Sequence, residues 1–210
     1  VNFQILKASE YGVPQHRRRV FFIGTKNGEK FEFPLPTHKE KDDLILKKMV
    51  STYEALHDLP LLEDELGESV QEYKLPIQNT YQELMRANSP HVLNHIAANH
   101  SEKVKETIKL VPPGKNYKAL PEELRNSRNF NVAWTRFPDH APSPTIDTGH
   151  RHHFHYYANR VPTVRECARL QSFPDRFEFI GNKTEQFRQV GNAVPPVLAQ
   201  TLAKKILEKL

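Results

Sequence analysis

The chain has 210 residues and a formal net charge of +5, and it is long enough for one ordinary domain with a core of its own. Its single cysteine, Cys167, excludes a disulfide framework and a zinc site built from several cysteines. No stretch approaches the roughly 18 apolar residues of a membrane helix, and the first residues lack a signal-peptide pattern. A cytoplasmic or otherwise intracellular location is therefore expected.

The first two elements are expected to be strands. Residues 2–8 have the pattern of a strand, and residues 19–24 form a continuous apolar run, typical of a strand buried on both faces. A break at residues 11–14 leaves a wide loop between them, which predicts an antiparallel hairpin. Because the sequence opens inside a strand with Val1 rather than Met, we expect a fragment or a processed piece of a longer protein.

A long irregular segment follows the hairpin. It is acidic over residues 39–76 and basic over residues 101–169. That layout suits a protein that presents selected faces to a polyanion, although solvated surface explains it equally well. Short helices are expected from the capping box at Ser51, near Tyr81, and from Ser101. The segment is too long for a plain loop and should form a small domain.

Two helices are expected at the end of the sequence. Thr163 and Glu166 form a second capping box, and Pro195 and Pro196 stand where a last helix would begin. This last helix carries apolar residues at four-residue spacing and needs an apolar surface, so residues 163–210 should pack against residues 1–37. The predicted segments are thus 1–38, 39–162 and 163–210.

Three clusters could carry chemistry. The first is Gln15-His16-Arg17-Arg18-Arg19, in which alternation places Gln15, Arg17 and Arg19 on one side. Arginines that enter a buried strand are costly unless they meet acceptors or anions, but taken alone the pattern fits a solvated loop better.

The second cluster is the helix over residues 165–174. Cys167 lies inside it without a neighbouring histidine or second cysteine, so a buried packing role is expected rather than a nucleophile. The third is residues 189–196, where Gly191-Asn192 precedes a proline-led helix. This is either a turn whose free amides hold a polar ligand or a simple joint.

In this order, the three clusters resemble the C-terminal motifs of the DNA cytosine-5 methyltransferases. Residues 11–21 resemble the QxRxR motif, residues 163–174 the R-E-x-A-R-L-Q-x-F-P motif, and residues 189–196 the G-N-A-V-P-P motif. Pro144-Thr145-Ile146 resembles the signature of the variable target recognition domain. The resemblance implies an α/β fold: the C-terminal portion of a Rossmann-like methyltransferase sheet, as an antiparallel strand hairpin plus returning helices. A small irregular mixed α/β target recognition domain would be inserted into it.

The resemblance also implies a mechanism. Such enzymes flip a cytosine out of duplex DNA, attack C6 with a cysteine thiolate and methylate C5 from S-adenosylmethionine. Arg19 would hydrogen-bond the ring at its O2 edge. Arg17 would lie beside it, near the flipped nucleotide and its phosphate, and Gln15 would fix the loop. Thr145 would contact a backbone phosphate.

The cofactor contacts implied are Asn192 and the turn amides of Ala193 and Val194. The Pro-Cys motif of the nucleophile, the Glu-Asn-Val motif and the Gly-rich cofactor turn are all absent from the sequence. The chain alone should therefore not methylate DNA. It would need the N-terminal catalytic half, on the same chain or as a separate subunit; the alternative is a non-catalytic DNA-binding module.

Residues 125–160 concentrate side chains of the types that contact DNA, and a run of histidines lies at 149–155. Arginine reads guanine edges or holds phosphates, so contacts with double-stranded DNA are expected here. No metal site is expected from the histidines, because a zinc site normally has a fuller ligand set. The expected DNA contacts, besides Thr145, are Arg128, Trp134, Arg136 and Arg151.

Overall fold

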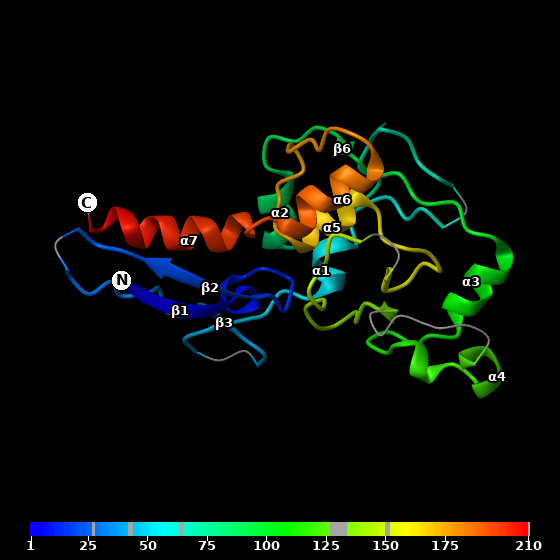
Figure 1. Cartoon of the computed structure of the whole chain (residues 1–210). Helices are drawn as coiled ribbons and strands as arrows, with labels where there is room; N and C mark the ends of the chain where they lie inside the picture. The colour runs from blue at the N-terminus through cyan, green and yellow to red at the C-terminus, as the bar shows by residue number, and fades with distance from the viewer. Residues whose placement is uncertain (27, 42–43, 64, 127–133, 150–151, 210) are drawn as a thin grey trace.

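The structure is a computed structural model that describes residues 1–26, 28–41, 44–63, 65–126, 134–149 and 152–209 (Figure 1). No helix in these ranges is both long enough and apolar enough to cross a membrane.

The predicted hairpin is confirmed. Strand β1 (Asn2–Lys7) pairs antiparallel with β2 (Arg18–Ile23), and a short 3-10 helix, η1 (Ala8–Tyr11), follows β1. The turn after η1 requires Gly12, whose φ is +84° and whose added Cβ would lie 2.9 Å from the His38 ring.

The two ends of the chain pack together, as expected. Helix α7 (Pro196–Leu207) lies alongside the hairpin (Figure 1). Its Leu198 is buried with Leu6, Ala8, Tyr11 and Val13 in one apolar cluster. The last helix therefore covers the inner face of the hairpin.

The outer face of the hairpin contradicts the prediction of a strand buried on both sides. Phe3, Ile5, Val20 and Phe22 are 70%, 65%, 48% and 68% exposed. They face each other across the ladder, Phe3 opposite Phe22 and Ile5 opposite Val20. The apolar residues of β2 point to both faces of the hairpin, but only one face is covered by other described residues.

The insert is built from short elements. The expected helices are confirmed near residues 51, 81 and 101, and the Ser51–Glu54 capping box is formed. The strands are only two residues long, which explains why no alternation is visible in the sequence. In chain order the insert has β3 (His38–Lys39), β4 (Lys47–Lys48), α1 (Thr52–Leu56), β5 (Val70–Gln71), α2 (Thr80–Arg86), β6 (Val92–Leu93), α3 (Glu102–Lys109), η2 (Tyr117–Ala119), α4 (Glu122–Arg125), β7 (Thr135–Arg136) and β8 (His153–Phe154). The pairs β3–β4 and β7–β8 are parallel, and β5–β6 is antiparallel.

Two apolar clusters hold the insert. One is its own, where Ile108 of α3 and Val111 just after the helix pack with Trp134 and Phe154. The other is shared with the helices that follow, α5 (Val164–Leu170) and α6 (Lys183–Asn192). The insert is therefore anchored on α5, whose seven residues are all buried.

Helix α6 was not expected from the sequence. Its N-terminus has a complete capping box between Asn182 and Glu185, which is the signal that could have revealed it. Its last turn contains Gly191 and Asn192, so the expected tight turn is the end of a helix. A Cβ on Gly191 would lie 2.3 Å from the carbonyl oxygen of Asp147, so only glycine permits this approach of α6 to the insert.

Candidate functional site

Gln15 links three parts of the chain. It is fully buried, and its amide donates to the Leu170 carbonyl (3.2 Å) and to Oε1 of Gln171 (3.1 Å). Its Oε1 accepts from the backbone N–H of Ile146 (3.0 Å). The side chain thus connects the hairpin loop to the insert and to the end of α5, in keeping with the loop-fixing role expected for it.

Arg17 lies inside the protein rather than beside a nucleotide. It is 2% exposed, and its guanidinium donates to the carbonyls of Ile146 (3.1 Å) and Gly191 (2.7 Å). Burial, with the neighbouring charge of Arg19, lowers the pKa of Arg17 to about 10, so it stays a cation at neutral pH. The expected contact with the flipped nucleotide is corrected: Arg17 ties the insert to α6.

Arg19 is the exposed arginine of the motif. Its Nη1 donates to the carbonyl of Arg18 at 2.7 Å, and the residue lies at the exposed start of β2. The QxRxR residues therefore do not all share one side, since Gln15 and Arg17 point inward. Arg19 is the guanidinium that remains available to a ligand.

Thr145 lies close to this loop. The residue is exposed, and its hydroxyl donates to the carbonyl of His16 at 2.7 Å. Its oxygen retains a lone pair that faces solvent and can bind a donor. The insert thereby brings Thr145 to the loop that leads into Arg19.

The residues expected to bind a cofactor lie at the exposed end of α6. Asn192 is exposed beside a shallow hollow that Ile180, Arg188 and Gln189 also line, and its side-chain amide makes no hydrogen bond within the described ranges. Val194 is 45% exposed. The amide of Ala193 donates to Val190 (3.3 Å), so one of the two expected turn amides is already engaged.

Trp134 and Arg136 do not fit the role of DNA contacts. Trp134 is buried edge-to-face against Phe154, with centroids 4.3 Å apart. Arg136 is 3% exposed. Its guanidinium donates to Oδ1 of Asn159 and to backbone carbonyls, among them those of Ile108 in α3 and Val111 just after it (both 2.6 Å). Both side chains build the insert. The other two expected contacts, Arg128 and Arg151, lie outside the described residues.

Helix α5 carries a buried ion pair that sequence reasoning missed. Arg160 donates to both carboxylate oxygens of Glu166, at 2.9 and 2.7 Å, and Nε2 of His155 lies 3.8 Å from the same carboxylate. Burial alone would raise the pKa of Glu166, but the Arg160 charge outweighs it and holds that pKa far below its usual value. Burial also lowers the pKa of His155 to about 3, so this histidine is neutral.

This pair predicts acid sensitivity. Because the folded pKa of Glu166 is depressed, its contribution to stability is present above the unfolded pKa, near 4.5, and is lost as pH falls toward the folded pKa. Denaturant titrations from pH 7 to pH 3 should show a steep loss of unfolding free energy below about pH 4.5. Glu166→Gln should be less stable at pH 7 and lose less on acidification. The exposed control Glu123→Gln should follow the wild type; a Glu166→Gln profile parallel to wild type would contradict the assignment.

Two of the described histidines after residue 150 contact protein groups. Nδ1 of His152 lies 2.9 Å from Asp147, and buried His155 accepts from the backbone of Ala158 (2.9 Å). In the described ranges, no three histidine, cysteine, aspartate or glutamate residues gather as metal ligands would.

Comparison with known proteins decides the family. Residues 1–208 match the family profile of the C-5 cytosine-specific DNA methylases. The chain belongs to this family.

The alignments with curated relatives extend over nearly all of this chain. It is 38% identical to the type II methyltransferase M.DdeI of Desulfomicrobium norvegicum, over 96% of this chain and 53% of the relative. It is 36% identical to the type II methyltransferase M1.HphI of Haemophilus parahaemolyticus, over 99% of this chain and 48% of that protein. The chain spans about half the length of these curated relatives.

A solved structure gives the same result for the fold. It is described as a DNA modification methyltransferase encoded within a prophage of E. coli, and it superposes with a TM-score of 0.74 at 26% identity. The match covers 99% of this chain and 60% of that one. The mixed α/β architecture is therefore that of a DNA methyltransferase.

Cys167 of this methylase chain is a packing residue, as expected. It is 5% exposed in the cluster around α5, and burial raises the pKa of its thiol. A thiol held neutral inside the protein is a poor nucleophile.

Proposed function

We propose that this chain supplies the DNA-reading and base-binding part of a DNA cytosine-5 methyltransferase of the modification type. The observation that carries the proposal is the rim formed by Arg19 and Thr145. Both residues are exposed, and the backbone beside them is fixed from within by Gln15 and Arg17. Arg19, the cation proposed to face the base, and Thr145, the residue proposed to contact a phosphate, are therefore carried by backbone that buried side chains hold in place.

Arg19 stabilises charge on the reacting base in this proposal. Attack at C6 of a flipped cytosine places negative charge on the ring, and a fixed guanidinium at its edge gains strength as that charge develops. Thr145 would contact a phosphate of the same strand by turning its hydroxyl, which donates to the His16 carbonyl in the free chain, toward a phosphate oxygen. In this proposal the DNA path follows the hairpin loop, where Arg18 and Arg19 are exposed.

S-adenosylmethionine is the methyl donor of the family and supplies an electrophilic methyl group. The unpaired amide of Asn192 and the exposed backbone of Val194 offer it polar contacts, so the residues present fit one edge of its site. The engaged amide of Ala193 is left out of the proposed contacts. The rest of the cofactor site and the nucleophile would come from the half that the chain does not span, on the same polypeptide or a separate one.

The outer face of the hairpin is the surface on which we place that half. Its four apolar residues would otherwise expose a contiguous patch, which soluble proteins rarely leave uncovered. Both edges of the two-stranded hairpin are also free within the described ranges, and such a hairpin is marginal by itself.

The double variant Phe3→Ser, Phe22→Ser tests this surface. We expect the variant to fold, because its changes are on exposed rings, but to lose association with the segment of M.DdeI that this chain does not match. Sedimentation of the mixed proteins measures it. Leu44→Ser, which changes an exposed leucine outside the hairpin, should assemble like wild type. Equal assembly of both variants, or self-association of this chain through the face, would contradict the assignment.

The function itself is tested with a completed enzyme, in which this chain is fused to that same M.DdeI segment. With unmethylated plasmid DNA and S-adenosylmethionine, the digested product should contain 5-methylcytosine. A fusion that folds and binds duplex DNA but makes none would show that the chain is a binding module.

A further inference from the structure

We infer that Asp58 and Arg169 are positioning residues: their buried ion pair holds the DNA-reading insert in register with the hairpin that carries Arg19. The inference rests on the proposed function. Both side chains are fully buried, so they act through the backbone that they hold.

Arg169 has every donor satisfied. Its Nε and Nη2 donate to the two oxygens of Asp175, both at 2.6 Å. Its Nη1 donates to Asp58 at 2.8 Å and to the Ala55 carbonyl at 2.9 Å, and Nη2 also donates to Asp58 at 3.2 Å. These contacts use all five N–H groups of a guanidinium, so its orientation is fixed.

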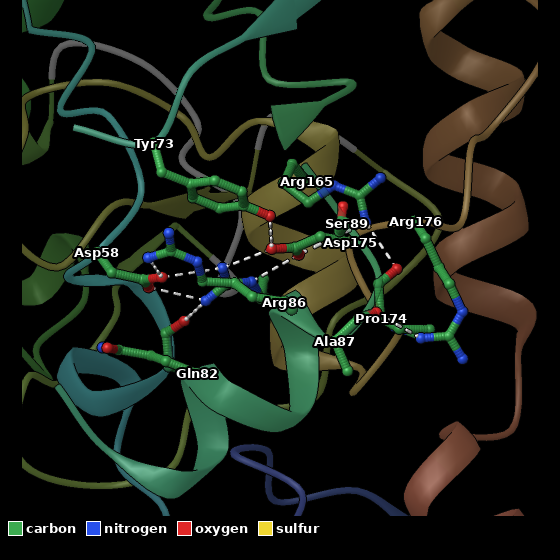
Figure 2. Close-up of polar contacts among 12 residues, drawn as sticks. Asp58, Tyr73, Gln82, Arg86, Ala87, Ser89, Arg165, Pro174, Asp175 and Arg176 are labelled. Carbon is green, nitrogen blue, oxygen red and sulfur yellow. Dashed lines mark hydrogen bonds and ion pairs between the residues drawn. The ribbon is translucent and has the colours of Figure 1, made fainter. Parts of the chain in front are cut away.

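A second layer closes around the pair, and Figure 2 shows it converging on the two carboxylates. The Tyr73 hydroxyl donates to Asp175 at 2.6 Å. The guanidinium of Arg86 lies 3.7 Å above the Tyr73 ring and donates to Asp58 at 3.4 Å. Tyr73, Arg86 and Asp58 come from the insert, whereas Arg169 and Asp175 come from the segment after it. The charge interaction between the two segments is therefore the one between Arg169 and Asp58, and the Tyr73 hydroxyl adds a neutral hydrogen bond to Asp175.

The geometry favours positioning over simple stabilisation. A buried ion pair is weak evidence for stability, and its best-attested use is to specify one arrangement. Paired forks between arginine and carboxylate fix angle as well as distance, whereas an apolar contact can slide. Gln15 and Arg17 make the second attachment, at Ile146. The insert is therefore held at two points far apart in its sequence, near residues 58 and 146.

The test uses the completed enzyme and measures DNA affinity and the single-turnover rate per titrated active site. Asp58→Asn keeps the size of the side chain and leaves the contact of Arg169 with Asp175 in place. It removes the charge of Asp58 and so the two-pronged ion pair between Asp58 and Arg169. We expect the rate at saturating plasmid DNA to fall at least about tenfold, with DNA affinity within about threefold of wild type. Tyr73→Phe, which removes one hydroxyl, should lower the rate less. Asp139→Asn, at a half-exposed aspartate of the insert paired with His140, is the matched control.

The outcomes separate the two claims. A wild-type enzyme that folds, binds DNA and forms no 5-methylcytosine contradicts the proposed function. An active wild type with the same rate per active site in Asp58→Asn, Tyr73→Phe and Asp139→Asn overturns the positioning role. So does a loss confined to the amount of folded protein, since a merely structural pair changes that amount and not the rate. If Asp58→Asn does not fold, Tyr73→Phe alone decides by the same comparison.

Discussion

Arg19→Ala in the completed enzyme should lower the single-turnover rate by about a hundredfold or more, with a much smaller change in DNA affinity. Arg19 is the exposed guanidinium of the hairpin loop, and its hydrogen bond to the base would strengthen as the ring becomes negative. Removing the guanidinium therefore destabilises the transition state more than it destabilises the bound DNA complex. Rates at saturating DNA, combined with equilibrium titrations, measure the two effects separately.

Arg18→Ala is the matched control for Arg19. It removes an adjacent exposed arginine whose backbone lies opposite Lys7 in the hairpin, and it should keep the normal rate at saturation. If Arg19→Ala binds DNA weakly but reacts at the normal rate once saturated, Arg19 holds DNA and is not part of the chemistry.

Arg136→Met should destabilise the protein by about 3 kcal/mol or more, because it leaves several buried carbonyl groups without donors at once. The acceptors are the end of α3 and the 155–158 loop, which the guanidinium joins. Denaturant unfolding measures the change, and exposed Lys118→Met should alter it little. DNA affinity of the folded fraction should stay near wild type. A stable Arg136→Met with weakened DNA binding would restore the earlier interpretation of Arg136 as a DNA contact.

The elements that the sequence predicts well are those with local signals. The capping boxes at Ser51 and Thr163 and the proline-led α7 depend on residues within one turn of each other, and all three are observed. The hairpin is also local. Helix α6 had the same kind of signal at Asn182, but its polar sequence and Gly191 concealed it.

The parts that escaped prediction depend on distant partners. Arg17 and Arg136 look like surface arginines until backbone carbonyls far along the chain are placed around them. Arg169 meets Asp58 across 111 positions, and no periodicity indicates that pair. One face of β2 is exposed because no layer covers it among the described residues, and its apolar sequence does not reveal this. Sequence patterns therefore located the QxRxR motif, but only the fold separated its exposed arginine, Arg19, from its buried one, Arg17.

We propose that this chain reads DNA for a methyltransferase whose nucleophile lies in the other half. Transfer of labelled methyl from S-adenosylmethionine to plasmid DNA tests it most directly, with the chain alone and with the completed enzyme. We expect no transfer by the chain alone, and transfer by the completed enzyme that survives Cys167→Ser. Turnover by the chain alone, abolished by Cys167→Ser, would contradict the account.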